Sequence, residues 1–119
     1  MKTVLGRVLP RHAETSVRAA LEDTRVVLVN GARQSGKSTL VRLAAGDRDA
    51  EWRDLDIALT RNAALGDPDG FVDGPGLMVI DEVQRAPGLI LALKKAVDDD
   101  PRPGRFLITG SVDLFRGAI

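Results

Sequence analysis

A short glycine-rich segment has the residue types needed to hold a chain of phosphates. Residues 31–38 read G-A-R-Q-S-G-K-S, which is the pattern G-x-x-x-x-G-K-[ST] of a P-loop, or Walker A motif. Its two glycines let the backbone turn N–H groups toward a phosphate without interference from a Cβ atom. Lys37 can place a positive charge on the β- and γ-phosphates, and the Ser38 hydroxyl is a hard oxygen ligand that suits Mg²⁺.

The predicted phosphate site runs from the first glycine to the threonine that follows the motif. Its residues are Gly31, Ala32, Arg33, Gln34, Ser35, Gly36, Lys37, Ser38 and Thr39. Arg33, Gln34 and Ser35 occupy the variable positions of the pattern and contribute only their backbone. Lys37 is also predicted to act in catalysis through its charge. The alternative is a chance match in a structural turn, and the flanking strand and helix patterns argue against it.

Two acidic residues follow an apolar run and form a second candidate motif, Walker B. Residues 77–80 read L-M-V-I, and Asp81 and Glu82 come directly after them. A buried strand that ends here would present Asp81 beside the P-loop, where it can hold Mg²⁺ opposite Ser38. Glu82 can then accept a proton from, or orient, the water that attacks the γ-phosphate. Strands often end in acids, so this interpretation depends on the P-loop upstream.

Polar residues at two further strand ends are candidates with an open alternative. Thr109 and Ser111 could contact the γ-phosphate, or they could simply end a strand in a turn. Asp54 and Asp56 could contact a metal ion or water. For Asp56 the favoured interpretation is an N-terminal cap of the helix that follows.

Strands and helices alternate around these residues, as in an α/β fold. Short apolar or alternating runs predict strands near residues 26–30, 51–55, 77–81 and 105–109. Helical patterns at 12–21, 39–45, 57–65 and 88–97 separate them. Residues 1–11 are predicted to be an extended or loosely ordered lead-in. We therefore divide the chain into a lead-in with a short helix, 1–25, and a P-loop core, 26–119.

Composition excludes several classes of function. Lys and Arg total 17 and so do Asp and Glu, giving a net charge of zero in 119 residues. A general nucleic-acid or anionic membrane surface needs a basic excess, so neither partner is expected. No cysteine is present, which excludes disulfides and thiolate zinc sites and suits a reducing cytoplasm. The N-terminus lacks the apolar run of a signal peptide, and no stretch is long enough to span a bilayer.

Four segments in order resemble one protein family. They are G-A-R-Q-S-G-K-S-T-L, W-R-D-L-D, V-I-D-E-V-Q-R-A-P and F-L-I-T-G-S. Together they resemble the N-terminal ATPase domain of a large bacterial and archaeal family of AAA-type ATP-binding proteins, which carry an additional C-terminal domain. The resemblance implies a P-loop NTPase fold, a three-layer α/β/α sandwich with a mainly parallel sheet in the order 5-1-4-3-2. It also implies that residues 31–39 bind ATP, Asp81 organises Mg²⁺, Glu82 is the catalytic carboxylate and residues 109–111 occupy a sensor position.

The chain departs from that family pattern at its end. Only four of the five strands are found, and the fifth strand, a helical lid and the C-terminal domain are not. We therefore expect a truncated chain in which the strand at 26–30 has an exposed edge. A homo-oligomer or protein partner would use the missing region.

The expected function is Mg-ATP binding, with ATP hydrolysis coupled to a conformational change in the complete form. ATP is favoured over GTP because the N-K-x-D motif is absent. One alternative is a nucleotide-binding switch or a remnant that does not hydrolyse ATP. A small P-loop kinase is a weaker alternative, because an acid directly after the Walker B aspartate suits water activation.

Overall fold

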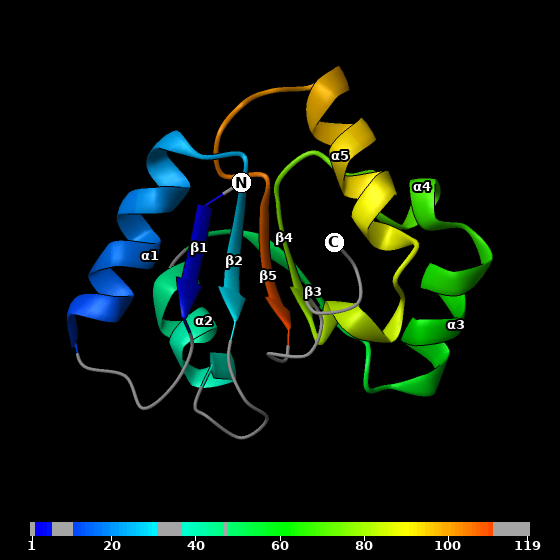
Figure 1. Cartoon of the computed structure of the whole chain (residues 1–119), viewed down its shortest axis with the longest axis horizontal. Helices are drawn as coiled ribbons and strands as arrows, with labels where there is room; N and C mark the ends of the chain where they lie inside the picture. The colour runs from blue at the N-terminus through cyan, green and yellow to red at the C-terminus, as the bar shows by residue number, and fades with distance from the viewer. Residues whose placement is uncertain (1, 6–10, 31–36, 47, 111–119) are drawn as a thin grey trace.

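The computed structural model describes residues 2–5, 11–30, 37–46 and 48–110, with side chains described in 14–30, 39–46 and 48–110. Strands, helices and a short 3₁₀ turn alternate along the chain (Figure 1). They are β1 (Lys2–Leu5), α1 (Arg11–Asp23), β2 (Val26–Asn30), α2 (Lys37–Ala45), β3 (Ala50–Asp54), α3 (Ala58–Gly66), α4 (Pro68–Phe71), β4 (Leu77–Asp81), η1 (Val83–Arg85), α5 (Leu89–Asp99) and β5 (Phe106–Gly110).

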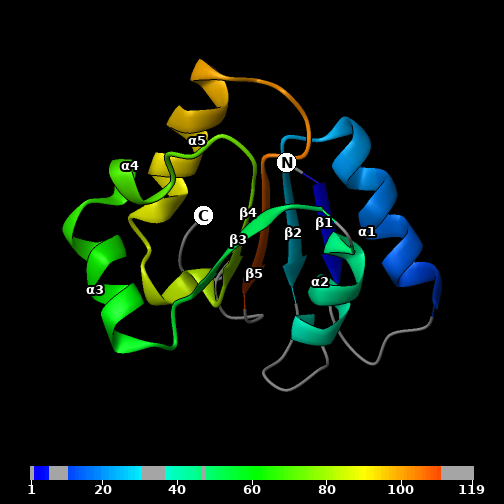
Figure 2. The ribbon, with the colours of Figure 1, turned by 180° about the vertical axis from the view of Figure 1, so that it is seen from behind.

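The strands form one parallel sheet covered by helices on both faces. The strand order is β1-β2-β5-β4-β3, and each neighbouring pair is parallel. Helices α1 and α2 lie on one face, and α3, α4 and α5 lie on the other (Figures 1 and 2). This is the predicted three-layer α/β/α sandwich of a P-loop NTPase.

Two apolar clusters fill the spaces between the layers. The central strands β2, β4 and β5 are buried on both faces, so their sequences are almost continuously apolar rather than alternating. Successive side chains point to opposite faces. In β4, for example, Val79 packs in the cluster beneath α1 and α2, and Ile80 packs in the cluster beneath α5.

The sequence prediction was wrong about the edge of the sheet beside β2. The four predicted strands lie in the predicted order, but Lys2–Leu5 form a fifth strand, β1, in place of the expected exposed edge. Its register with β2 runs from Lys2 opposite Val27 to Leu5 opposite Asn30. Pairing with β1 satisfies backbone groups that β2 would otherwise leave open. A run of four residues is too short to show the period of a strand, so the sequence alone does not predict β1.

The parallel arrangement brings the carboxyl ends of all five strands to one edge of the sheet (Figure 1). In open α/β sheets this edge is where ligands bind. Within the described residues, no helix combines the length and the apolar character needed to cross a membrane.

Candidate functional site

The predicted phosphate-binding segment joins a buried strand to a helix at the carboxyl edge. β2 ends at Asn30 and α2 begins at Lys37. α2 is held against the sheet by buried residues such as Leu40 and Val41. Residues 31–36 and the side chains of Lys37 and Ser38 lie outside the described part of the chain. What the structure describes is the strand before the motif and the helix after it, which is the arrangement that a P-loop requires.

Three polar side chains lie in a row across neighbouring strands at this edge. Asp54 of β3 is in register with Asp81 of β4. Ile80 is in register with Ile108, so Thr109 of β5 lies at the level of Asp81. By strand alternation all three point to the sheet face that α2 covers. The structure thus brings the predicted Asp81 and Thr109 together, 28 residues apart in the sequence.

The Thr109 hydroxyl connects the two acids of the predicted Walker B motif. Its Oγ1 donates a hydrogen bond to Oδ1 of Asp81 and accepts one from the backbone N–H of Glu82 at 2.9 Å. Thr109 is fully buried. From its buried position the Thr109 hydroxyl therefore fixes the Asp81 carboxylate and the backbone of Glu82. Contact of Thr109 with a γ-phosphate stays a prediction, and Ser111 lies outside the described residues.

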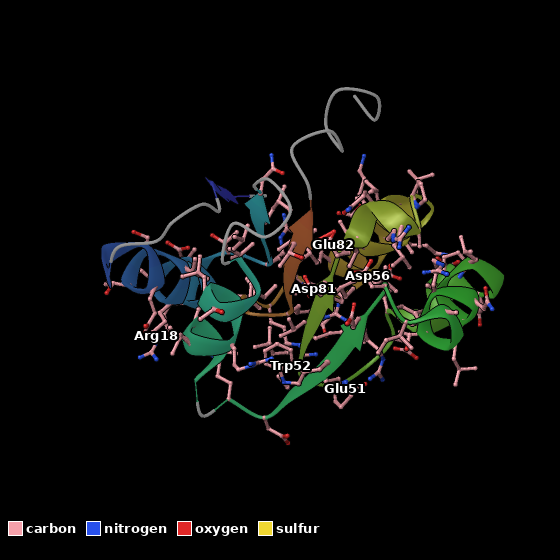
Figure 3. The ribbon with its side chains drawn as sticks, turned by 90° about the horizontal axis from the view of Figure 1, so that it is seen from below. Arg18, Glu51, Trp52, Asp56, Asp81 and Glu82 are labelled. Carbon is pink, nitrogen blue, oxygen red and sulfur yellow. The ribbon has the colours of Figure 1, made fainter. Side chains whose placement is uncertain are left out.

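Glu82 is held in an unusual backbone conformation directly after β4. Its φ of 63° and ψ of 52° place it in the left-handed region, which residues other than glycine rarely adopt. Its N–H is bonded to Thr109, and its carbonyl accepts from the Arg85 N–H at 3.0 Å. The side chain is only 5% exposed, and its Oε2 accepts a hydrogen bond from Nε2 of Gln84 at 2.6 Å. Figure 3 shows Asp81 and Glu82 close together at this edge.

The loop after β3 contradicts one prediction. Asp56 is not the N-cap residue of α3, because that position is Ile57, whose side chain makes no capping bond. Asp56 instead accepts a hydrogen bond from Nε of Arg85 at 3.0 Å, across 29 residues of sequence. The carboxylate that does bond a local backbone group is that of Asp54, whose Oδ1 accepts from the Asp56 N–H at 2.9 Å.

The contact made by Gln84 was missed by sequence reasoning. Gln84 stands two residues after Glu82, in the segment V-I-D-E-V-Q-R-A-P, and the sequence pattern assigns it no role. The 3₁₀ turn η1 brings its amide back onto the carboxylate. Nothing in the local pattern predicts such a turn, although an amide so close to a candidate catalytic acid is a signal worth testing.

A cavity of about 400 Å³ lies beside Asp81, between α2 and the strands β3 and β4. Its lining residues are Val41, Arg42, Trp52, Arg53, Asp54, Val79 and Asp81. A larger hollow of about 850 Å³ lies between α4, α5 and the segments that lead into β4 and β5. That hollow is distant from every candidate motif, and its charged residues include the ion pairs Lys95–Asp69 and Arg102–Asp100. We therefore place the candidate site at the carboxyl edge despite the larger size of the other hollow.

The chemistry of the donors fits Mg²⁺. Asp81 offers a carboxylate that is partly exposed at the strand end, and its neighbours at the same level carry oxygen atoms. Within the described residues no three His, Cys, Asp or Glu side chains form a group that could hold a metal alone. Mg²⁺ at nucleotide sites usually needs only one or two protein ligands, because phosphates and water supply the rest.

Comparison with known proteins gives one family and two relatives. A family model described as an AAA domain matches residues 23–116. The chain is 41% identical over 104 residues to an uncharacterized protein of Mycobacterium tuberculosis, Rv2008c, and equally to an uncharacterized protein of Mycobacterium bovis, Mb2031c. Each alignment covers 85% of this chain but spans only 23% of the relative's length. No solved structure gave a significant match.

Proposed function

Because the chain belongs to this AAA domain family, we propose that it binds ATP with Mg²⁺ and that the complete protein hydrolyses the ATP. The observation that supports the proposal most is the hydroxyl of Thr109, which holds Asp81 and Glu82 together at the edge where β2 leads into α2. An arrangement that fixes a metal-binding carboxylate and a second carboxylate beside a phosphate site suits attack of water on a phosphate.

We assign the binding of the nucleotide phosphates to residues 31–39, which connect β2 to the first turn of α2. The loop lends its backbone N–H groups to the phosphates, and the start of α2 adds its unpaired N–H groups and the positive end of its dipole. Lys37 pairs with the β- and γ-phosphates. Ser38 and Asp81 hold Mg²⁺, which neutralises charge on the phosphates when it is bound.

Glu82 is proposed as the general base. A water molecule positioned next to the γ-phosphate would donate its proton toward the Glu82 carboxylate as it attacks the phosphorus atom, and ADP would leave. Burial of Glu82 excludes competing solvent, and the bonds to its backbone hold it in one place. We assign to the complete protein the conformational change that ATP hydrolysis drives, and any homo-oligomer or protein partner.

The binding proposal is tested by calorimetry. We expect the wild-type chain to bind Mg-ATP and Lys37→Ala to bind at least about tenfold more weakly, because a hydrogen-bonded charge contact contributes about 1.5–3 kcal/mol. Lys94→Ala, which removes an exposed lysine of α5, is the matched control and should bind as wild type. Equal affinity in the Lys37 and Lys94 variants would reject the P-loop assignment.

The hydrolysis proposal is tested with Glu82→Gln, which keeps the size of the side chain but removes its basic oxygen. We expect Mg-ATP binding to persist and phosphate release to fall by about 10²- to 10⁴-fold, the usual contribution of a general base. Asp49→Asn, at an exposed acid on the opposite edge of the sheet, is the control. Turnover is measured on the complete protein, and binding by its wild-type form without any turnover would favour the alternative of a nucleotide-dependent switch.

A further inference from the structure

The side chain of Gln84 holds the carboxylate of Glu82 by a direct hydrogen bond. The amide Nε2 donates to Oε2 at 2.6 Å. Hydrogen bonds to an ionised acceptor are shorter and stronger than those between neutral groups. Glu82 is 5% exposed, so water competes weakly for the same oxygen.

The backbone of Glu82 is fixed, but that alone does not direct the carboxylate. Thr109 bonds the Glu82 N–H and Arg85 bonds its carbonyl, so the main chain has little freedom. Three side-chain torsions still separate the Glu82 backbone from its carboxylate, and each has several staggered or broad minima. A bond at the carboxylate end selects among them, and the bond from Gln84 is at that end.

Gln84 itself is firmly supported. It is the middle residue of η1, and the turn is anchored in the core by Val83 and Ala86, which are 0% and 1% exposed. The N–H of Ala86 closes the turn on the carbonyl of Val83 at 3.1 Å. The amide is therefore presented from a rigid turn rather than from a mobile loop.

We propose that Gln84 is a positioning residue that directs the Glu82 carboxylate toward the attacking water. The inference rests on the proposed role of Glu82 in hydrolysis. With Oε2 bonded to Gln84, the orientation of the Glu82 carboxylate is set. The proposed action of Gln84 is exerted through Glu82 and not on the reacting atoms.

The test replaces Gln84 with methionine, which has similar length but no amide. We expect kcat to fall about 10- to 100-fold, because a displacement of about 1 Å in a reacting group can reduce the rate 10²-fold. The Kd for Mg-ATP should stay at the wild-type value. The variant should remain folded, although its melting temperature should fall because the buried Glu82 carboxylate loses a hydrogen-bond partner. The control is Arg85→Gln in the same turn, whose side chain bonds Asp56 and not Glu82. It should keep the wild-type kcat.

A second readout does not depend on activity. In ¹H–¹⁵N spectra of the nucleotide-free protein, one side-chain amide proton of Gln84 should be shifted downfield and exchange slowly. Both signatures should disappear in Glu82→Ala, which removes the acceptor.

The outcomes separate the inference from the proposed function. A wild-type kcat in Gln84→Met, or an equal loss in Gln84→Met and Arg85→Gln, would overturn the positioning role while hydrolysis stands. A Gln84 amide signal that is unchanged by Glu82→Ala would overturn it as well. A wild-type protein that binds Mg-ATP without any turnover would reject the proposed hydrolysis first, and the inference with it.

Discussion

At the scale of single residues, Glu82 keeps an unfavourable left-handed backbone conformation. This indicates that the placement of its side chain is maintained at a cost in conformational energy. A residue with a Cβ atom costs about 1–2 kcal/mol in this conformation. Its hydrogen bonds to Thr109 and Arg85 hold the chain there nonetheless. Backbone strain of this kind is concentrated at functional sites, where the surrounding structure enforces it.

The strain can be measured by comparing two variants at this position. Glu82→Gly and Glu82→Ala both remove the carboxylate, but only alanine keeps the Cβ atom that conflicts with a φ of 63°. We expect the glycine variant to be more stable than the alanine variant by about 1 kcal/mol. Unfolding in urea measures the difference. An alanine variant of equal or greater stability would show that Glu82 is not strained.

Thr109 permits a second test at this scale. Thr109→Val keeps the shape of the side chain but leaves the buried N–H of Glu82 without its hydroxyl partner. We expect a loss of about 1–3 kcal/mol in the free energy of unfolding. Thr109→Ser keeps the hydroxyl and should lose less. If valine and serine destabilise equally, the hydroxyl bridge contributes nothing.

At the scale of elements, the turn that leads into β5, the strand of Thr109, requires glycine at one position. Gly104 has a φ of 73°, and its N–H donates to the Thr24 carbonyl at 3.0 Å, which joins the turn to the end of α1. A Cβ atom on Gly104 would lie 3.0 Å from the Leu21 carbonyl oxygen. The turn therefore requires glycine for its conformation and for its close approach.

Two alanine substitutions separate these requirements from the general effect of removing a glycine. Gly104→Ala should destabilise the protein by about 1–2 kcal/mol, because it forces a Cβ into the left-handed region. Gly66→Ala, at the end of α3, meets nothing within 4 Å and should be neutral or stabilising by up to about 1 kcal/mol. Denaturant unfolding measures the stability of both variants. Similar stabilities would contradict the requirement for glycine at position 104.

At the scale of the whole molecule, the proposed site exists only when the fold is complete. Its described parts come from α2, from the segment of β4 and η1, and from β5, which are distant in sequence and come together only when the sheet forms. A ligand that binds such a site stabilises the folded state by mass action, by about 2.7 kcal/mol at 100 times its Kd. Ligand binding is therefore visible in thermal unfolding.

We expect Mg-ATP to raise the melting temperature of the wild-type chain, and chelation of Mg²⁺ to reduce that rise. Asp81→Asn should respond to ATP but lose the additional rise with Mg²⁺, because it removes a carboxylate charge from the metal site. Differential scanning fluorimetry with and without a chelator gives the comparison. A full Mg²⁺-dependent rise in Asp81→Asn would exclude Asp81 as the metal ligand.

Local pattern was sufficient to predict much of this protein. The P-loop, the apolar run before Asp81 and each predicted strand or helix extend over fewer than twenty residues. The structure confirms the α/β/α sandwich and the order of the four predicted strands. Patterns of this kind depend on backbone geometry and the burial of one or both faces, which neighbouring residues determine among themselves.

The errors and omissions all concern partners that are distant in sequence or depend on a turn. Residues 2–5 form a strand by pairing with β2, and Asp56 pairs with Arg85, 29 residues further along the chain. The register of β5 with β4 brings the Thr109 hydroxyl into contact with Asp81 and Glu82. The 3₁₀ turn brings the Gln84 amide into contact with the Glu82 carboxylate. Register and turn geometry arise from packing of the whole sheet, so the composition of any one segment does not reveal them.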